Sequence, residues 1–66
     1  MDGWKKWLGK KVYVERYDKH PLQGTVTDIR IVEDPNYPKI VLGMIDKFQK
    51  IVEIDVAQIE SIKEEN

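Results

Sequence analysis

The run LQGTVTDIRIV (residues 22–32) alternates in the manner of a β-strand, but its apolar residues change face part-way along. Leu22 and Val26 fall on one parity of the alternation, whereas Ile29 and Ile31 fall on the other. A regular strand buries only one parity, because successive side chains point to opposite faces of a sheet. The run therefore predicts a long strand with a bulge or sharp bend near Thr27 and Asp28.

On either side of this run, the chain predicts four more strands separated by turns. Proline, glycine and asparagine mark the breaks between the apolar segments. We expect strands over 10–17 (Val12 and Val14 inward), 40–45, 50–54 (Val52 and Ile54 inward) and 59–62. The segments between them are expected to form a turn at 18–21, a loop at 33–38, a tight connection at 46–49 and a 3₁₀ turn at 55–58 capped by Asp55. Residues 63–66 are expected to form a frayed charged tail. We place the strand over 40–45 at an edge of the sheet, where a second copy of the chain could pair with it.

Composition supports a β fold. Of the 27 apolar residues, 15 are Val or Ile, whose branched side chains fit a pleated surface better than a helix. Sixty-six residues make one small domain, and no segment resembles a signal peptide or a membrane span, so we expect a cytoplasmic protein. The absence of cysteine excludes disulfides, thiolate zinc sites and a thiol nucleophile.

The first nine residues predict a short helix. Asp2 can cap it, and Trp4, Trp7 and Leu8 form one apolar stripe at helical spacing. Gly9 is placed to end it.

This order of elements resembles the small five-stranded barrels of the SH3-like and Sm-like group. The resemblance is carried by LGKKVYV (residues 8–14), LQGTVTDI (residues 22–29) and IDVAQIESI (residues 54–62). It implies a five-stranded barrel with a short leading helix over 1–9 and a 3₁₀ turn before the last strand. Sm-like proteins assemble as rings and bind RNA through an Asp, an Asn and an Arg-Gly pair. Here only Asp28 matches and no Arg-Gly pair occurs, so the RNA pocket is not carried over.

The charge is unevenly divided along the chain. Residues 1–20 hold six Lys or Arg against three Asp or Glu, whereas residues 21–66 hold five against nine. Cations interleaved with aromatic rings suit a nucleic-acid backbone and its bases. Candidate nucleic-acid-binding residues are Lys5, Lys6, Lys10, Lys11, Arg16, Lys19, Tyr13 and Tyr17. The other interpretation is that these lysines surround a buried tryptophan pair, and the net charge of −1 favours it.

Three aromatic residues are candidate anchors for a protein partner: Tyr37, which lies in the loop between two prolines, and the pair Trp4 and Trp7. Tyr37 could equally close one end of the barrel.

The sequence offers little for catalysis or metal binding. His20, the one histidine, precedes a proline in a polar turn. The carboxylates Asp46, Glu53, Asp55 and Glu60 show no ion-loop spacing. We therefore expect no enzyme, cofactor or metal, but a binding or adaptor module. A protein partner is favoured over nucleic acid, and a homo-oligomeric structural protein is a further alternative.

Overall fold

The computed structural model describes residues 3–33, 35–36 and 38–65 of the chain, which form one antiparallel β-sheet with two short 3₁₀ turns. In chain order the elements are η1 (Lys5–Trp7), β1 (Lys11–Arg16), β2 (Lys19–Val32), β3 (Lys39–Asp46), β4 (Ile51–Asp55), η2 (Val56–Gln58) and β5 (Ile59–Glu64). No helix in these ranges is long and apolar enough to cross a membrane. The mainly β fold predicted from the composition is confirmed.

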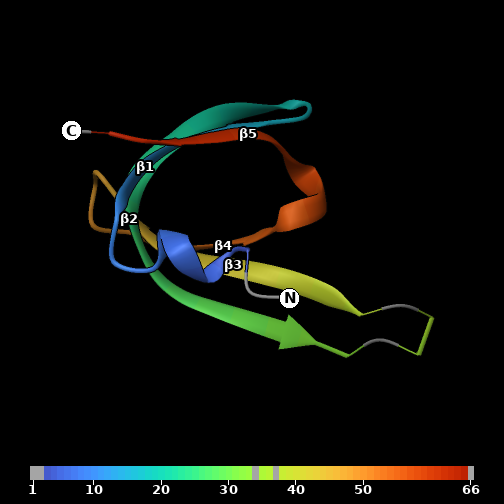
Figure 1. The fold of residues 1–66 in the computed structure, drawn as a ribbon. Helices are drawn as coiled ribbons and strands as arrows, with labels where there is room; N and C mark the ends of the chain where they lie inside the picture. Colours follow the sequence, from blue (N-terminus) through green and yellow to red (C-terminus); the bar gives the residue numbers. More distant parts are fainter. Residues whose placement is uncertain (1–2, 34, 37, 66) are drawn as a thin grey trace.

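The strands lie in the order β4-β3-β2-β1-β5, and all neighbours are antiparallel. Figure 1 shows the sheet curling round, so that η2 links its two outer strands, β4 and β5. Among the described residues no ladder joins those two strands, so the sheet is curled but open. β3 lies inside the sheet, because it pairs with both β2 and β4. The prediction that residues 40–45 form an edge strand is wrong, and their continuous apolar run suits this interior place.

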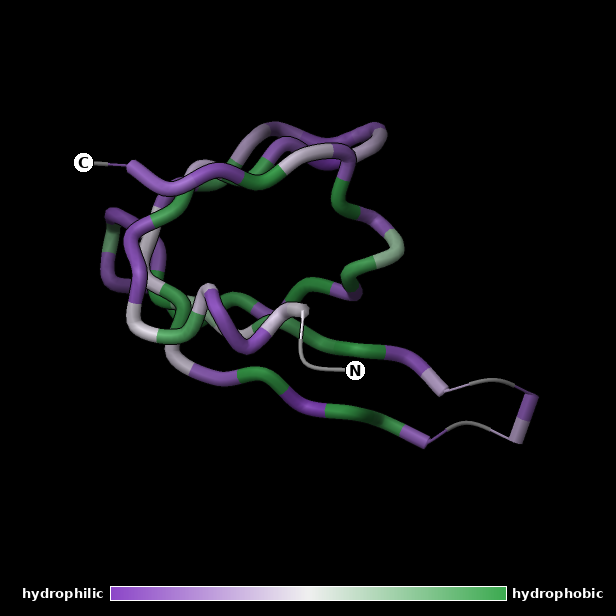
Figure 2. Tube along the Cα trace, viewed as in Figure 1, coloured by the Kyte–Doolittle hydropathy of each residue, from purple (hydrophilic) through white to green (hydrophobic). Residues whose placement is uncertain are grey.

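β2 is long and bent, as its sequence predicts. Val26 pairs with Met44 but Asp28 pairs with Gly43, so the register shifts at Thr27 and the predicted bulge is confirmed. Beyond the bulge, the end of β2 and the start of β3 form an arm that projects from the curled part of the sheet (Figure 1). Hydrophilic and hydrophobic positions alternate along the β2 strand of this arm (Figure 2).

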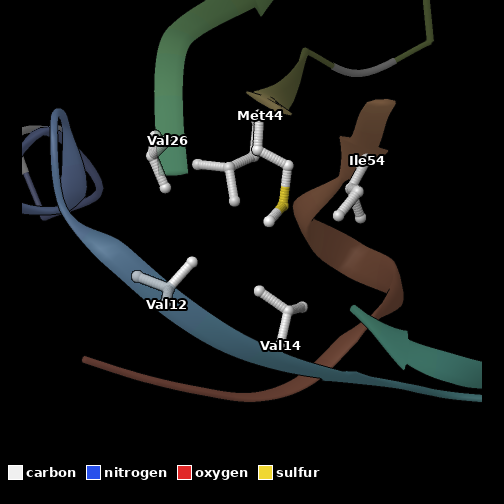
Figure 3. Close-up of a cluster of buried hydrophobic side chains, with 6 residues drawn as sticks. Val12, Val14, Val26, Met44 and Ile54 are labelled. Carbon is white, nitrogen blue, oxygen red and sulfur yellow. The ribbon is translucent and has the colours of Figure 1, made fainter. Parts of the chain in front are cut away.

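The core lies inside the curl and is made by the inward parity of four strands. Six side chains are at most 1% exposed, and a second group, which includes Trp4, Trp7 and Val52, packs against them. Figure 3 shows the side chains of β1, β2, β3 and β4 converging on this space. The six are Val12, Val14, Val26, Leu42, Met44 and Ile54. The predicted inward faces of 10–17 and 50–54 are therefore confirmed.

Three local predictions need correction. The leading helix is a 3₁₀ turn of three residues, which ends before Gly9 at φ +80°. The turn after β1 is shorter than expected, since β2 already begins at Lys19, which pairs with Arg16. The Arg16 guanidinium also donates to the carbonyl oxygen of His20 at 2.9 Å. The tail is not frayed through Glu65, whose N–H donates to the carbonyl oxygen of Lys11 at 2.8 Å.

Candidate functional site

Large apolar side chains that remain in solvent mark the surface most suited to recognition. Phe48 is 70% exposed and Ile51 is 81% exposed, the highest values among the large apolar side chains of the described residues. Both belong to the hairpin that joins β3 to β4. The other exposed members of this class are Leu8, Tyr17, Ile31 and Val32.

The β3–β4 hairpin holds these two side chains in place. Ile45 pairs with Ile51 next to the inward pair of Met44 and Val52, so Ile45 and Ile51 point to the outer face of the sheet. Phe48 lies in the connecting turn. We call Ile45, Phe48 and Ile51 the hairpin patch.

The turn that carries Phe48 is fixed by one carboxylate. An Asp46 oxygen accepts the backbone N–H of Phe48 at 2.9 Å and that of Lys50 at 2.8 Å. The N–H of Asp46 in turn donates to the carbonyl oxygen of Lys50 at 2.9 Å. Gln49 takes φ +67°, a left-handed conformation that the tight turn requires. Phe48 is thus presented on an ordered turn, so a partner that binds it has little backbone left to order.

A groove of about 460 Å³ adjoins the hairpin patch and shares Ile45 with it. Most of its lining residues carry polar or charged groups, but the surface that they expose in the groove is mainly apolar. The Gln23 amide donates to a Glu65 carboxylate oxygen at 3.0 Å on one side. The groove is lined by Lys11, Gln23, Gly24, Thr25, Thr27, Ile45, Asp46, Lys47, Gln49 and Glu65.

The charged side chains of the groove differ in the contacts that they make within the protein. The carboxylates of Asp46 and Glu65 each accept hydrogen bonds from the chain. The Lys47 ammonium lies 5.3 Å from the centroid of the Phe48 ring, in the solvent-exposed turn. Lys11 is exposed, and its side chain has no ion-pair partner within the described part of the chain. The cations of the groove are therefore the groups most available to a ligand.

The predicted protein anchors lie elsewhere. Trp4 and Trp7 are half-buried and pack against the core, and the Lys6 ammonium lies 5.2 Å from the centroid of the Trp7 ring. The two rings therefore offer a partner only part of their surface. Tyr37 lies outside the described residues.

The predicted nucleic-acid-binding residues are divided among three places. Lys5 and Lys6 lie on η1. Lys10 directly precedes β1, and Lys11 and Tyr13 lie on the outer face of that strand. Arg16, Tyr17 and Lys19 surround the β1–β2 turn. Several of the cations have partners in the chain. The Lys10 ammonium pairs with Glu64 at 3.4 Å, and Arg16 donates to the His20 carbonyl oxygen.

Sequence reasoning missed Lys63, which joins Tyr13 through the β1–β5 register. Its ammonium lies 5.5 Å from the centroid of the Tyr13 ring. It also missed Ile51, although a signal was present. The alternation that places Val52 and Ile54 inward places Ile51 outward.

Of the remaining acidic candidates, Asp55 and Glu53 have partners in the chain, and Glu60 is exposed. Asp55 caps η2 by accepting the N–H of Ala57 at 2.9 Å, as predicted. Arg30 contacts both Glu53 and Asp28 on the outer face, across Gly43. Within the ranges that the structure describes, no group of three or more His, Asp or Glu is placed to hold a metal ion.

Comparison of the chain with family models, with curated proteins and with solved structures finds no match.

Proposed function

We propose that this chain is a non-catalytic module that binds a segment of a protein partner on the hairpin patch and the adjoining groove. The observation that carries the proposal is the exposure of Phe48 and Ile51. A domain of 66 residues has few large apolar groups for its core, yet these two are 70% and 81% exposed. Clustered apolar exposure on a small domain is typical of an interaction surface.

The chemistry of the surface indicates the kind of segment it binds. Phe48 and Ile51 are anchors that a partner's apolar side chains would cover, and an aromatic ring on an ordered turn is a favoured hot spot. Lys11 and Lys47 lie along the groove beside them, and their ammonium groups suit carboxylates of the partner. The partner segment is accordingly apolar with acidic neighbours.

The fold supports such a role without specifying it. We propose that the curled sheet is a small barrel of the SH3-like or Sm-like kind whose ladder is left open between β4 and β5. The support is the order of elements, the bulged second strand and the 3₁₀ turn before the last strand. In this arrangement the core fills the interior, so binding uses the outer face and the loops.

A displayed library of random peptides tests the proposal. We expect the wild-type chain to enrich peptides that combine aromatic or aliphatic residues with Asp or Glu. Phe48→Ala and Ile51→Lys should each weaken binding of the selected peptides by about tenfold or more, the loss typical of a hot-spot residue. Leu8→Lys is the matched control, because Leu8 is 53% exposed on a different surface.

The same preparation discriminates a nucleic-acid ligand. Mixed single-stranded and duplex oligonucleotides are passed over the immobilised chain at low and moderate salt. Salt-sensitive retention that is lost in the Lys10→Glu, Lys11→Glu double variant would favour nucleic acid over protein. Such retention, or a peptide selection with no enrichment, would overturn the proposal.

A further inference from the structure

The arm has a free edge. β1 pairs with β2 as far as Thr25, and the backbone of Val26 is still engaged, by the N–H of Gly9 at 2.8 Å and the carbonyl oxygen of Lys10 at 3.0 Å. Beyond the bulge, residues 28–32 pair with β3 on one side and with no strand of the described chain on the other. We call these five residues the arm edge.

The arm edge differs from the two outer strands of the sheet. Charged side chains along both outer strands oppose self-pairing: β4 carries the exposed Glu53 and the half-buried Asp55, and β5 carries exposed charges that include Glu60 and Glu64. The arm edge instead carries one anion and one cation, Asp28 and Arg30, which pair at 3.1 Å. Its alternate positions are apolar.

The apolar positions of the arm edge remain largely in solvent. Ile31 is 63% exposed and Val32 is 36% exposed. Ile31 faces Ile40 across the β2–β3 ladder, while Ile29, two residues closer to the bulge, packs against the core. The apolar side of the arm is therefore continuous with the core and is left uncovered at its outer end.

We propose that the arm edge binds the arm edge of a second copy of this chain, as antiparallel strands related by a two-fold axis at Ile29. Directly opposed residues of an antiparallel pair have a constant sum of positions, so this register places Asp28 opposite Arg30 of the second copy, and the reverse. The charge pattern is thus complementary to itself. The pairing gives the unpaired backbone groups of residues 28–30 their partners and places Ile31 of each copy opposite Thr27, at the two ends of the paired segment.

This inference is independent of the hairpin patch, since the patch and the arm edge lie at opposite ends of β3. Each therefore supplies a control for the other. Ile31→Lys changes an exposed side chain of the arm edge, and Ile51→Lys changes an exposed side chain of the hairpin patch.

Sedimentation equilibrium over a range of protein concentrations gives the test. The wild-type chain should approach twice its mass of 7.8 kDa as the concentration rises. Ile31→Lys, which puts an ammonium group in place of an exposed apolar side chain at each end of the paired segment, should shift the dissociation constant upward by at least tenfold, whereas Ile51→Lys should leave it unchanged. Circular dichroism checks that both variants keep the β fold. A monomer at every concentration, a mass above two copies, or a dimer indifferent to Ile31→Lys would each overturn the proposal.

The register has its own test, because the chain contains no cysteine. Asp28→Cys and Arg30→Cys variants are mixed and left to oxidise in air. Directly opposed positions of antiparallel strands have Cα atoms about 4.5–5.5 Å apart, within disulfide range. Mixed disulfides between the two variants should therefore form in preference to either symmetric one. An excess of symmetric Arg30→Cys disulfides would instead move the two-fold axis to position 30 and refute the register.

Discussion

Replacing Gly24 with alanine should separate β2 from β3 at a position where the two backbones lie close together. A Cβ at this position would lie 2.1 Å from the Ile45 carbonyl oxygen and 2.8 Å from the Asp46 Cα. Both are backbone atoms, so no side-chain rotation can relieve the contact. The gap of 2.1 Å must widen to at least 3.0 Å, the distance below which Cβ contacts essentially never occur, and to 3.4 Å for an ordinary van der Waals contact.

The cost follows from what that widening breaks. Moving the strands apart by about an ångström takes two or three ladder hydrogen bonds out of range, at about 1 kcal/mol each. Strain in the surrounding packing adds about 1–2 kcal/mol. We therefore expect Gly24→Ala to lower the free energy of unfolding by about 3–5 kcal/mol, which is a large part of the stability of a domain this size. The corresponding loss in Tm is about 12 °C or more.

Urea denaturation followed by circular dichroism measures this loss, and two other glycines calibrate it. Gly43→Ala should be milder, because its Cβ would lie 3.2 Å from the Asp28 side chain. Gly3→Ala should be neutral, since nothing lies within 4 Å. A Gly24→Ala variant within about 0.5 kcal/mol of wild type, the usual range for surface changes, would refute the close approach of β2 and β3.

Three further predictions concern the core and the hairpin turn. Ile54→Asp should unfold the domain, because the side chain is 1% exposed and an unpaired buried charge costs several kcal/mol, whereas Ile51→Asp should leave the urea midpoint nearly unchanged. Asp46→Ala should lower the free energy of unfolding by about 1–2 kcal/mol, since two backbone N–H groups lose their acceptor. Asp46→Asn, which keeps an acceptor oxygen, should lower it by less. Equal losses in the two variants would show that the acceptor oxygen is irrelevant. Gln49→Gly should raise the melting temperature by a few degrees, because glycine adopts φ +67° without the strain of a side chain; a lower melting temperature would contradict this.

Local patterns predicted those parts of the fold that local chemistry determines. The parity change around Thr27 predicted the bulge, and Asp55 before a segment too short for an α-helix predicted the cap of η2. The predicted leading helix does not form, because its segment is too short to nucleate an α-helix. Gly9, in the left-handed region, limits the segment to one 3₁₀ turn. A capping pattern says where a helix can start but not whether it is long enough to persist.

The parts that could not be predicted depend on pairing between distant residues. The charges of Lys63 to Glu65 indicate a solvated tail, yet the ladder with β1 orders them, because an edge strand can be stabilised through its backbone alone. The contact between Lys63 and Tyr13 requires that register. The candidate site was missed for a related reason: apolar residues were assigned to the core, and the exposed place of Phe48 depends on the turn that Asp46 closes.

The two proposed surfaces can be occupied at the same time because β3 separates them. Ile40 lies at the arm end of this eight-residue strand and Ile45 lies at the hairpin end, so their joint occupation meets no steric conflict. Two copies joined at their arm edges would present two hairpin patches on one rigid body. A partner that carries two copies of the recognised segment would then bind with an effective concentration set by the spacing of the patches, and its affinity would exceed that of a single segment. The exposed apolar residues near the two ends of β3 therefore serve different contacts. Pairing of two copies raises the affinity for the partner above the low affinity of a single small patch.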